Sequence, residues 1–241
     1  MKILAVDTST KHMSLAINNG DVTLVSRNSR PRKDLSLSIT FDIERILQRA
    51  NVRLTDLEGF VVGLGPGSFT GLRVGLSMLK AFVMVTGKPV VGVSSLDAIA
   101  MNVRLSRLRS PLQVCVINDA RRSLVYSSLY DKNPDGLVRR RPYQLEPLEK
   151  VLEGLEGEVV FIGDATPLYK DAIMLKAETF KPVFEPEKRW LPKAAELGKM
   201  GYQRLLKGES DKIDELAPLY LYPEDCQVGG PKGSHDKGKA K

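Results

Sequence analysis

A run of closely spaced glycines at residues 63–75, Gly-Leu-Gly-Pro-Gly-Ser-Phe-Thr-Gly-Leu-Arg-Val-Gly, constrains the fold of this chain more than any other feature. It follows an apolar run at 60–62, typical of a buried strand, and leads into a long helical pattern. A glycine-rich turn of this kind usually indicates a phosphate-binding loop. Here no Gly-Lys-Ser or Gly-Lys-Thr is present, and Gly67 and Gly71 are separated by three residues where the dinucleotide fingerprint needs two. The next strand ends in Ser94 rather than in an acidic residue that binds ribose. These residues therefore do not match either kind of nucleotide-binding loop.

On a helix with about 100° per residue, residues 67–85 form two separate apolar stripes. The first is predicted to face the core of its own domain and contains Phe69, Leu72, Leu76, Leu79 and Val83. The second combines glycines with apolar side chains. Each interior glycine costs about 1 kcal/mol relative to alanine, and glycines four residues apart let another helix approach closely. The second stripe is thus either buried inside the domain or a groove for a partner helix. We predict a partner interface at Gly67, Gly71, Val74, Gly75, Met78 and Phe82.

The composition indicates to which classes of protein this chain can belong. A hydrophobic content of 42% supports well-formed cores, and the apolar runs are shorter than the ~18 residues of a membrane span. The first residues indicate a strand rather than a signal peptide, so we expect a cytoplasmic protein without membrane contact. Part of the net charge of +7 lies in a Gly/Lys tail at 229–241, which is predicted to be disordered. The arginines between 104 and 141 lack the interleaved aromatic residues that stack bases, so we expect them at solvated edges.

The order of the predicted elements indicates an α/β fold. Strands at 3–7, 14–18 and 22–26 are followed by helix, strand, helix, strand and helix, which is the order of a ribonuclease-H-like unit. A shorter version of this order begins again at 112. We predict two tandem ribonuclease-H-like (actin-like ATPase) domains, the second shorter and degenerate. Their expected ranges are 1–100, which carries the partner-binding helix, and 101–228, followed by the tail.

Several motifs occur in the order found in a known family. They are Asp7-Thr8-Ser9-Thr10, the glycine run from 65 to 75, Gly92-Val93-Ser94-Ser95-Leu96, Asp119-Ala120-Arg121-Arg122 and Pro218-Leu219-Tyr220-Leu221. Over about residues 1–222, the chain closely resembles the bacterial TsaB (YeaZ) family, actin-like relatives of TsaD. It departs from the family pattern at Leu35-Ser36, where His-Ser is usual, and at Tyr222, where arginine is usual.

The resemblance implies a role in making N6-threonylcarbamoyladenosine at position 37 of tRNAs that read codons starting with adenine. In that pathway TsaD performs the transfer, TsaB is its required partner, and TsaE is an ATPase. Catalytic members of the wider family bind a metal through two histidines four apart on a helix. This chain has only His12 and His235, so we predict neither a metal site nor catalytic residues. The resemblance also implies an actin-like phosphate loop, Asp-x-Gly-Thr. The corresponding residues Asp7, Thr8 and Ser9 lack its glycine and are predicted to form a degenerate loop, in which Asp7 caps the turn.

Our main hypothesis is a non-catalytic scaffold that binds TsaD through the glycine-containing helix and the helix before it. It has no cofactor of its own, and ATP or ADP with magnesium is a candidate only for the junction of the complex. The expected partners are TsaD, TsaE, a second copy of this chain when TsaD is absent, and tRNA through the complex alone. On this hypothesis Gly71→Arg or Gly75→Glu abolishes TsaD binding and leaves the fold largely intact. The alternatives are an autonomous actin-like ATP-binding enzyme, either an ATPase or a kinase, and a tRNA-binding module driven by the arginines.

Overall fold

The computed structural model describes residues 1–31, 34–104 and 112–222, and the predicted tail at 229–241 lies outside them. The first half of the chain alternates strands and helices in the predicted order. Its elements are β1 (Lys2–Asp7), β2 (Met13–Asn19), β3 (Val22–Ser29), α1 (Leu35–Ala50), the 3-10 turn η1 (Leu54–Asp56), β4 (Gly59–Gly63), α2 (Phe69–Thr86), β5 (Val90–Val93) and α3 (Ser95–Ala100). The second half contains β6 (Leu112–Asp119), β7 (Val125–Asn133), β8 (Gly136–Arg139), β9 (Gln144–Glu146), α4 (Leu148–Leu152), β10 (Gly157–Ile162), α5 (Thr166–Leu175), β11 (Phe180–Phe184), η3 (Glu187–Arg189) and α6 (Ala194–Leu206).

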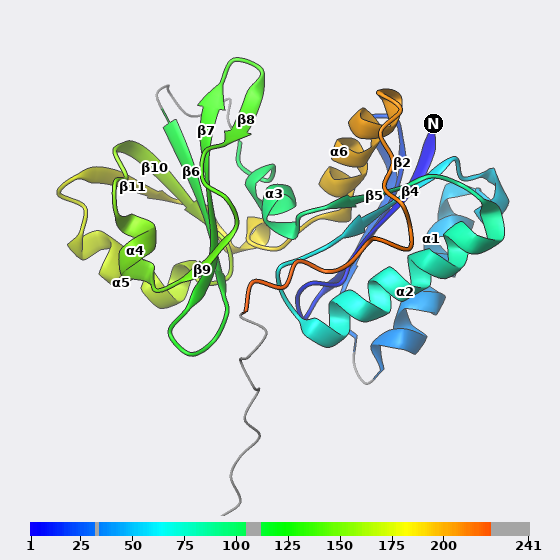
Figure 1. Cartoon of the computed structure of the whole chain (residues 1–241), viewed down its shortest axis with the longest axis horizontal. Helices are drawn as coiled ribbons and strands as arrows, with labels where there is room; N and C mark the ends of the chain where they lie inside the picture. The colour runs from blue at the N-terminus through cyan, green and yellow to red at the C-terminus, as the bar shows by residue number, and fades with distance from the viewer. Residues whose placement is uncertain (32–33, 105–111, 223–241) are drawn as a thin grey trace, which may run out of the picture.

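The first sheet has the strand order β3-β2-β1-β4-β5. Its first three strands form an antiparallel meander, and β4 and β5 continue from β1 in parallel. The side chains of β1 alternate between the two faces of the sheet. They are buried on both faces because helices cover both. Leu4 and Val6 pack with α1 and α2 on one face, whereas Ile3 and Ala5 pack with α6 on the other. We call this sheet with α1, α2 and α6 the first unit (Figure 1).

The second sheet has six strands, and five of them repeat the same arrangement in the order β8-β7-β6-β10-β11. Strands β6, β7 and β8 form an antiparallel meander, β9 pairs antiparallel with β7, and β10 and β11 continue from β6 in parallel. One face packs against α4 and α5. The opposite face packs against α3, which lies between the two sheets (Figure 1). The structure is thus mixed α/β with two sheets, and we call the second sheet with α4 and α5 the second unit.

The C-terminal part of the chain returns to the first unit. The predicted division at residue 100 assigned α6 to the second domain, whereas α6 packs on the first sheet. A Cβ added at Gly201 would lie 2.2 Å from a methyl of Val61, and one at Gly198 would lie 2.4 Å from Asn18 Oδ1. Both glycines therefore allow this helix to lie unusually close to the sheet. The residues after it, 207–222, continue along the β5 edge, and we call them the C-terminal strap (Figure 1).

Among the described residues, α2 is one helix with the length and apolar composition of a membrane span, with a mean hydropathy of 1.3. Three of its leucines, Leu72, Leu76 and Leu79, are buried in the protein. A core helix passes the same length and composition test, and packing on the sheet accounts for these apolar residues.

Candidate functional site

The glycines of α2 and its preceding loop are covered by the chain's own β1–β2 loop. A Cβ added at Gly67 would lie 2.1 Å from the carbonyl oxygen of Ser9, and one at Gly71 would lie 2.1 Å from that of Thr8. At Gly75 the added atom would lie 2.3 Å from Thr8 Oγ1. The prediction that these glycines form a free strip for a partner helix is therefore wrong. They allow close approach, but the segment that approaches is residues 8–9 of the same chain.

Two hydrogen bonds join this loop to α2. The Ser68 amide donates to the Ser9 carbonyl at 2.7 Å, and the Thr8 hydroxyl donates to the Gly71 carbonyl at 2.7 Å. Ser68 is also the N-cap of α2, and its hydroxyl accepts from the Gly71 amide. Substituting Gly71 with Arg or Gly75 with Glu is therefore expected to disturb the fold as well as any partner binding, contrary to the sequence hypothesis.

Asp7 closes the turn after β1 from a fully buried position. One carboxylate oxygen accepts from the amide and hydroxyl of Ser9, at 3.0 and 2.7 Å, and the other accepts from the Ser95 hydroxyl at 2.5 Å. Burial raises the pKa of this carboxyl, and the hydrogen bonds from Ser95 and Ser9 oppose the increase. Asp7 thus caps its turn as predicted. Both of its carboxylate oxygens accept hydrogen bonds from the protein. The predicted degenerate phosphate loop of Asp7, Thr8 and Ser9 is therefore bonded to groups of the same chain.

The other predicted interface residues lie beside α1. Val74, Met78 and Phe82 are half-buried and pack against the core that α1 and α2 share. Phe82 also contacts Phe60 of β4, with ring centroids 6.0 Å apart. Phe69, predicted to face the core, is 54% exposed. Its ring lies against Tyr220 of the C-terminal strap, with the Arg73 guanidinium 3.8 Å from the ring centroid.

Large apolar side chains remain exposed on the outer side of the same two helices. Leu37 and Phe41 lie one turn apart on α1 and are 61% and 67% exposed, and Met84 and Val85 at the end of α2 are both 81% exposed. Leu37 and Phe41 are four residues apart, so helical spacing could have indicated that they share a face, but they were not predicted as interface residues. We define the α1–α2 face as these four residues together with the half-buried Val74, Met78 and Phe82.

A cleft of about 660 Å³ lies where loops of the two units meet. The first unit contributes the β1–β2 loop and the turn before α2, and the second contributes the ends of β6 and β10. Its lining residues include Ser9, Lys11, His12, Gly67, Asp119, Ala120, Arg121, Tyr126, Asp164, Glu187 and Trp190. The motif at 119–122 was recognisable in the sequence. Lys11 and Trp190 could not be predicted as cleft residues, because they are far apart in the sequence and only the fold brings them together.

Two carboxylates of the second unit dominate the polar wall of the cleft. The Asp164 carboxylate accepts from the Asp119 amide at 2.8 Å, and the Asp119 carboxylate accepts from the Arg121 amide at 2.8 Å and forms an ion pair with the Arg121 guanidinium at 3.3 Å. Burial raises the pKa of Asp164, the hydrogen bond from the Asp119 amide opposes the increase, and the charge of the Asp119 carboxylate adds to it. Within residues 1–31, 34–104 and 112–222, no group of three or more His, Cys, Asp and Glu side chains could hold a metal ion.

Comparisons with known proteins agree on one family. The sequence profile described as "TsaD: tRNA N6-adenosine threonylcarbamoyltransferase" matches residues 32–227. The tRNA threonylcarbamoyladenosine biosynthesis protein TsaB of Bacillus subtilis is 31% identical over 92% of this chain and 94% of its own length. The Escherichia coli protein of the same name is 26% identical with the same coverage.

Solved structures support the same relationship at the level of the fold. YeaZ from Pseudomonas aeruginosa superimposes with a TM-score of 0.76 at 24% identity, covering 91% of this chain and 99% of its own. The Acidaminococcus fermentans (R)-2-hydroxyglutaryl-CoA dehydratase component A superimposes with a TM-score of 0.52 at 11% identity, covering 86% and 99% of the two chains. The chain therefore belongs to the TsaD family that the profile describes and, within it, to the TsaB (YeaZ) proteins.

Proposed function

We propose that this protein is a non-catalytic partner of TsaD in forming the threonylcarbamoyl group on N6 of adenosine 37 of tRNAs that read codons beginning with adenine. The names of its TsaB relatives support the pathway. The observation that carries the proposed role within the pathway is the exposed apolar α1–α2 face.

The α1–α2 face has the character of a docking surface. Phe41 and Met84 expose most of their side chains to solvent, although both helices belong to a well-packed unit. The two helices contact each other and cover the same side of the first sheet (Figure 1). Leu37 and Phe41 lie near the start of α1, and Met84 and Val85 lie at the end of α2. Exposed large apolar side chains on neighbouring helices are typical of an interaction site. Family membership supplies the occupant, a TsaD protein.

The first of the loops that hold phosphate in actin-like enzymes packs here on the chain's own glycines, which supports a role without catalysis. The backbone carbonyls of Thr8 and Ser9 lie against the glycines of α2, so this part of the glycine run serves internal packing. In the cleft, Asp119, Asp164 and Glu187 would repel a polyphosphate, and Arg121 is already paired with Asp119. The strand order that the first sheet shares with five of the six strands of the second supports our inference of two tandem actin-like units, of which the second is degenerate.

A second candidate function is an autonomous ATP-binding enzyme, and the cleft favours it. Its volume of about 660 Å³ is within the usual range for small-molecule pockets. This alternative predicts that the purified chain binds and turns over Mg-ATP without TsaD. The scaffold proposal predicts no turnover by the chain alone, and nucleotide with magnesium only at the junction with TsaD.

The direct test is calorimetric titration of this chain with the TsaD of the same organism. Met84→Asp places a charge on the α1–α2 face, and Leu175→Asp makes the same kind of change on α5 at an equally exposed residue, 81% in both cases. Truncated or disrupted interface anchors typically cost about 2 kcal/mol or more, so Met84→Asp should weaken binding at least tenfold. Leu175→Asp should bind as wild type does. Equal affinity of both variants and wild type would contradict the proposal.

The same face gives a further expectation for the isolated chain. Without TsaD, two copies should associate through their α1–α2 faces, and Phe41→Asp should shift the sedimentation coefficient to that of a monomer. Weak homodimers form at about tens of micromolar. A wild-type chain that sediments as a monomer at that concentration would count against the predicted homodimer. We propose TsaE as a further partner, tRNA contact only through the complex, and a cytoplasmic location.

A further inference from the structure

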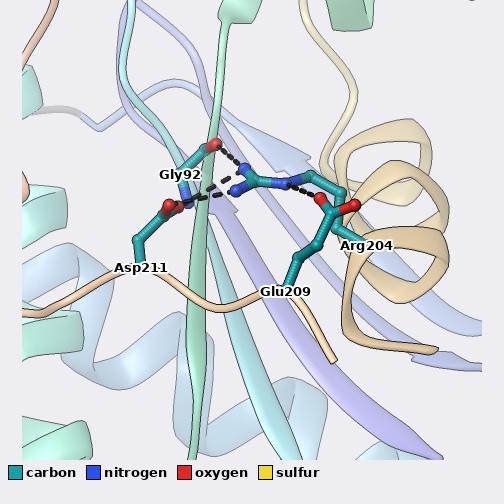
Figure 2. Close-up of polar contacts among 4 residues, drawn as sticks. All are labelled: Gly92, Arg204, Glu209 and Asp211. Carbon is teal, nitrogen blue, oxygen red and sulfur yellow. Dashed lines mark hydrogen bonds and ion pairs between the residues drawn. The ribbon is translucent and has the colours of Figure 1, made fainter. Parts of the chain in front are cut away.

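The C-terminal strap begins with a polar anchor on the first unit (Figure 2). Arg204 of α6 donates to the Gly92 carbonyl at 2.9 Å and to Asp211 Oδ1 at 3.0 Å, and it forms an ion pair with Glu209 at 3.2 Å. The Asp211 carboxylate in turn accepts from the Gly92 amide at 2.7 Å, and its amide donates to the Val90 carbonyl. The strap is therefore attached to the otherwise open edge of β5 by both main-chain and side-chain contacts.

The middle of the strap lies against the first unit and the start of α2. Leu216 is 9% exposed and belongs to the core beneath α1 and α2. The Leu219 amide donates to the Leu64 carbonyl in the loop before α2 at 2.8 Å. The ring of the next residue, Tyr220, contacts that of Phe69 in a tilted arrangement with centroids 5.2 Å apart, and its hydroxyl accepts from Arg73 at 3.1 Å.

The last described residues of the strap contact the second unit. Leu221 and Tyr222 pack against the core between α3 and the second sheet. The Tyr222 hydroxyl donates to the Ala120 carbonyl, and its ring meets Tyr126 edge-on with centroids 6.2 Å apart. Ala120 and Tyr126 both line the cleft. The strap thus joins the β5 edge of one unit to the cleft wall of the other.

The part of the second unit that Tyr222 holds is a strained turn. Arg121, Arg122 and Ser123, directly after Ala120, have φ angles of 68°, 52° and 59°. Left-handed backbone is unfavourable for residues other than glycine, and such strain persists only where the surroundings hold it in place. Tyr222 supplies a hydrogen bond to Ala120 before this turn, and its ring packs against Tyr126 after it.

We propose that the C-terminal strap is a clasp that sets the relative orientation of the two units and thereby the width of the cleft. Tyr222 is its contact with the second unit, and the Arg204–Asp211 pair is its anchor on the first. This inference concerns the isolated chain and does not rest on the proposed function.

The test is electron–electron distance measurement between spin labels on the two units. Gln48→Cys on α1 and Asp171→Cys on α5 replace exposed residues. Cys226 is replaced by serine, whereas Cys115 stays because it is buried and its pKa is raised to about 12, so it does not take a label. Wild type should give one narrow distance distribution. Tyr222→Ala should broaden it at least twofold, because the second unit is released.

Tyr220→Ala is the matched control, because it removes a tyrosine of the same strap that contacts only the first unit. Its distribution should be as narrow as that of wild type. A narrow distribution for Tyr222→Ala, or equal broadening by both variants, would overturn the proposal. If the circular dichroism melt shows that Tyr222→Ala does not fold, Tyr222→Phe removes only the hydrogen bond to Ala120. That variant should broaden the distribution measurably, and a distribution as narrow as that of wild type would overturn the clasp.

Discussion

Replacing Gly71 with alanine tests directly why α2 contains glycines. In an ordinary helix this change stabilises a protein by about 1 kcal/mol, because alanine is the better helix former. Here the new methyl would lie 2.1 Å from the Thr8 carbonyl oxygen. Carbon–oxygen contacts normally begin at about 3.3 Å, so the two backbone segments would have to separate by roughly 1 Å. Overpacking costs about 1–3 kcal/mol, and the upper end applies because both segments are held by hydrogen bonds.

The expected net effect is a loss of about 2 kcal/mol in the free energy of unfolding. For a chain of this size that corresponds to a lower melting temperature by about 4–8 °C. Urea unfolding followed by circular dichroism measures the change, with Ser77→Ala on the exposed side of α2 as the control, expected within about 0.5 kcal/mol of wild type. A Gly71→Ala variant as stable as wild type would show that space is free beside this glycine, and the packing argument would be refuted.

Gly75 gives a sharper version of the same experiment. The methyl of Gly75→Ala would meet the Thr8 hydroxyl at 2.3 Å, whereas that of Gly71→Ala meets the Thr8 backbone. Thr8→Ala should therefore relieve more of the damage at Gly75, where it removes the clashing hydroxyl, than at Gly71, where the clashing backbone carbonyl stays and only the hydrogen bond from Thr8 is lost. Double-mutant cycles detect such coupling when it exceeds about 0.5 kcal/mol. Equal coupling in the two cycles would contradict the geometry.

Two further predictions concern buried groups. The pKa of Asp7 is raised by burial above 3.8, and a carboxyl with a higher pKa in the folded chain supports folding below its unfolded pKa and loses that contribution as the pH rises. Asp7→Asn should therefore become more stable relative to wild type as the pH rises above about 4; a constant difference in urea unfolding would contradict this. Burial raises the pKa of the Cys115 thiol to about 12, so in a Cys226→Ser background it should react with Ellman's reagent only after unfolding, and a fast reaction of the native protein would disprove the buried placement.

Much of the fold could be predicted from local patterns. The hairpin meander, the strand before the glycine run and the helix after it are confirmed by β1 to α2. Three strands of the second sheet, β8, β9 and β11, were not predicted. Strand β11 contains Pro182, and proline removes an amide from the sheet, which its position at the sheet edge tolerates. The turn at Pro134-Asp135-Gly136 before β8 was a usable hairpin signal. The return of α6 to the first sheet depends on contacts such as Gly201 with Val61, which no local pattern contains.

The candidate site was harder to predict because its decisive contacts are distant in sequence. Glycine spacing correctly indicated close approach, but it does not specify which segment approaches. Thr8 and Gly71 are 63 residues apart, and their contact follows from the parallel pairing of β1 with β4. The exposed residues Leu37 and Phe41 do follow a simple helical spacing, yet exposure itself depends on which face of α1 the core covers.

Reconstituted threonylcarbamoylation of tRNA tests most directly whether this protein acts as the partner of TsaD. The reaction uses TsaD and TsaE of the same organism, unmodified tRNA and the activated threonylcarbamoyl donor, with and without this chain. We expect modification only when the chain is present, a loss of modification with Met84→Asp, and wild-type yield with Leu175→Asp. Full modification without the chain, or equal yields with both variants, would contradict the claim that the α1–α2 face makes this protein the partner of TsaD.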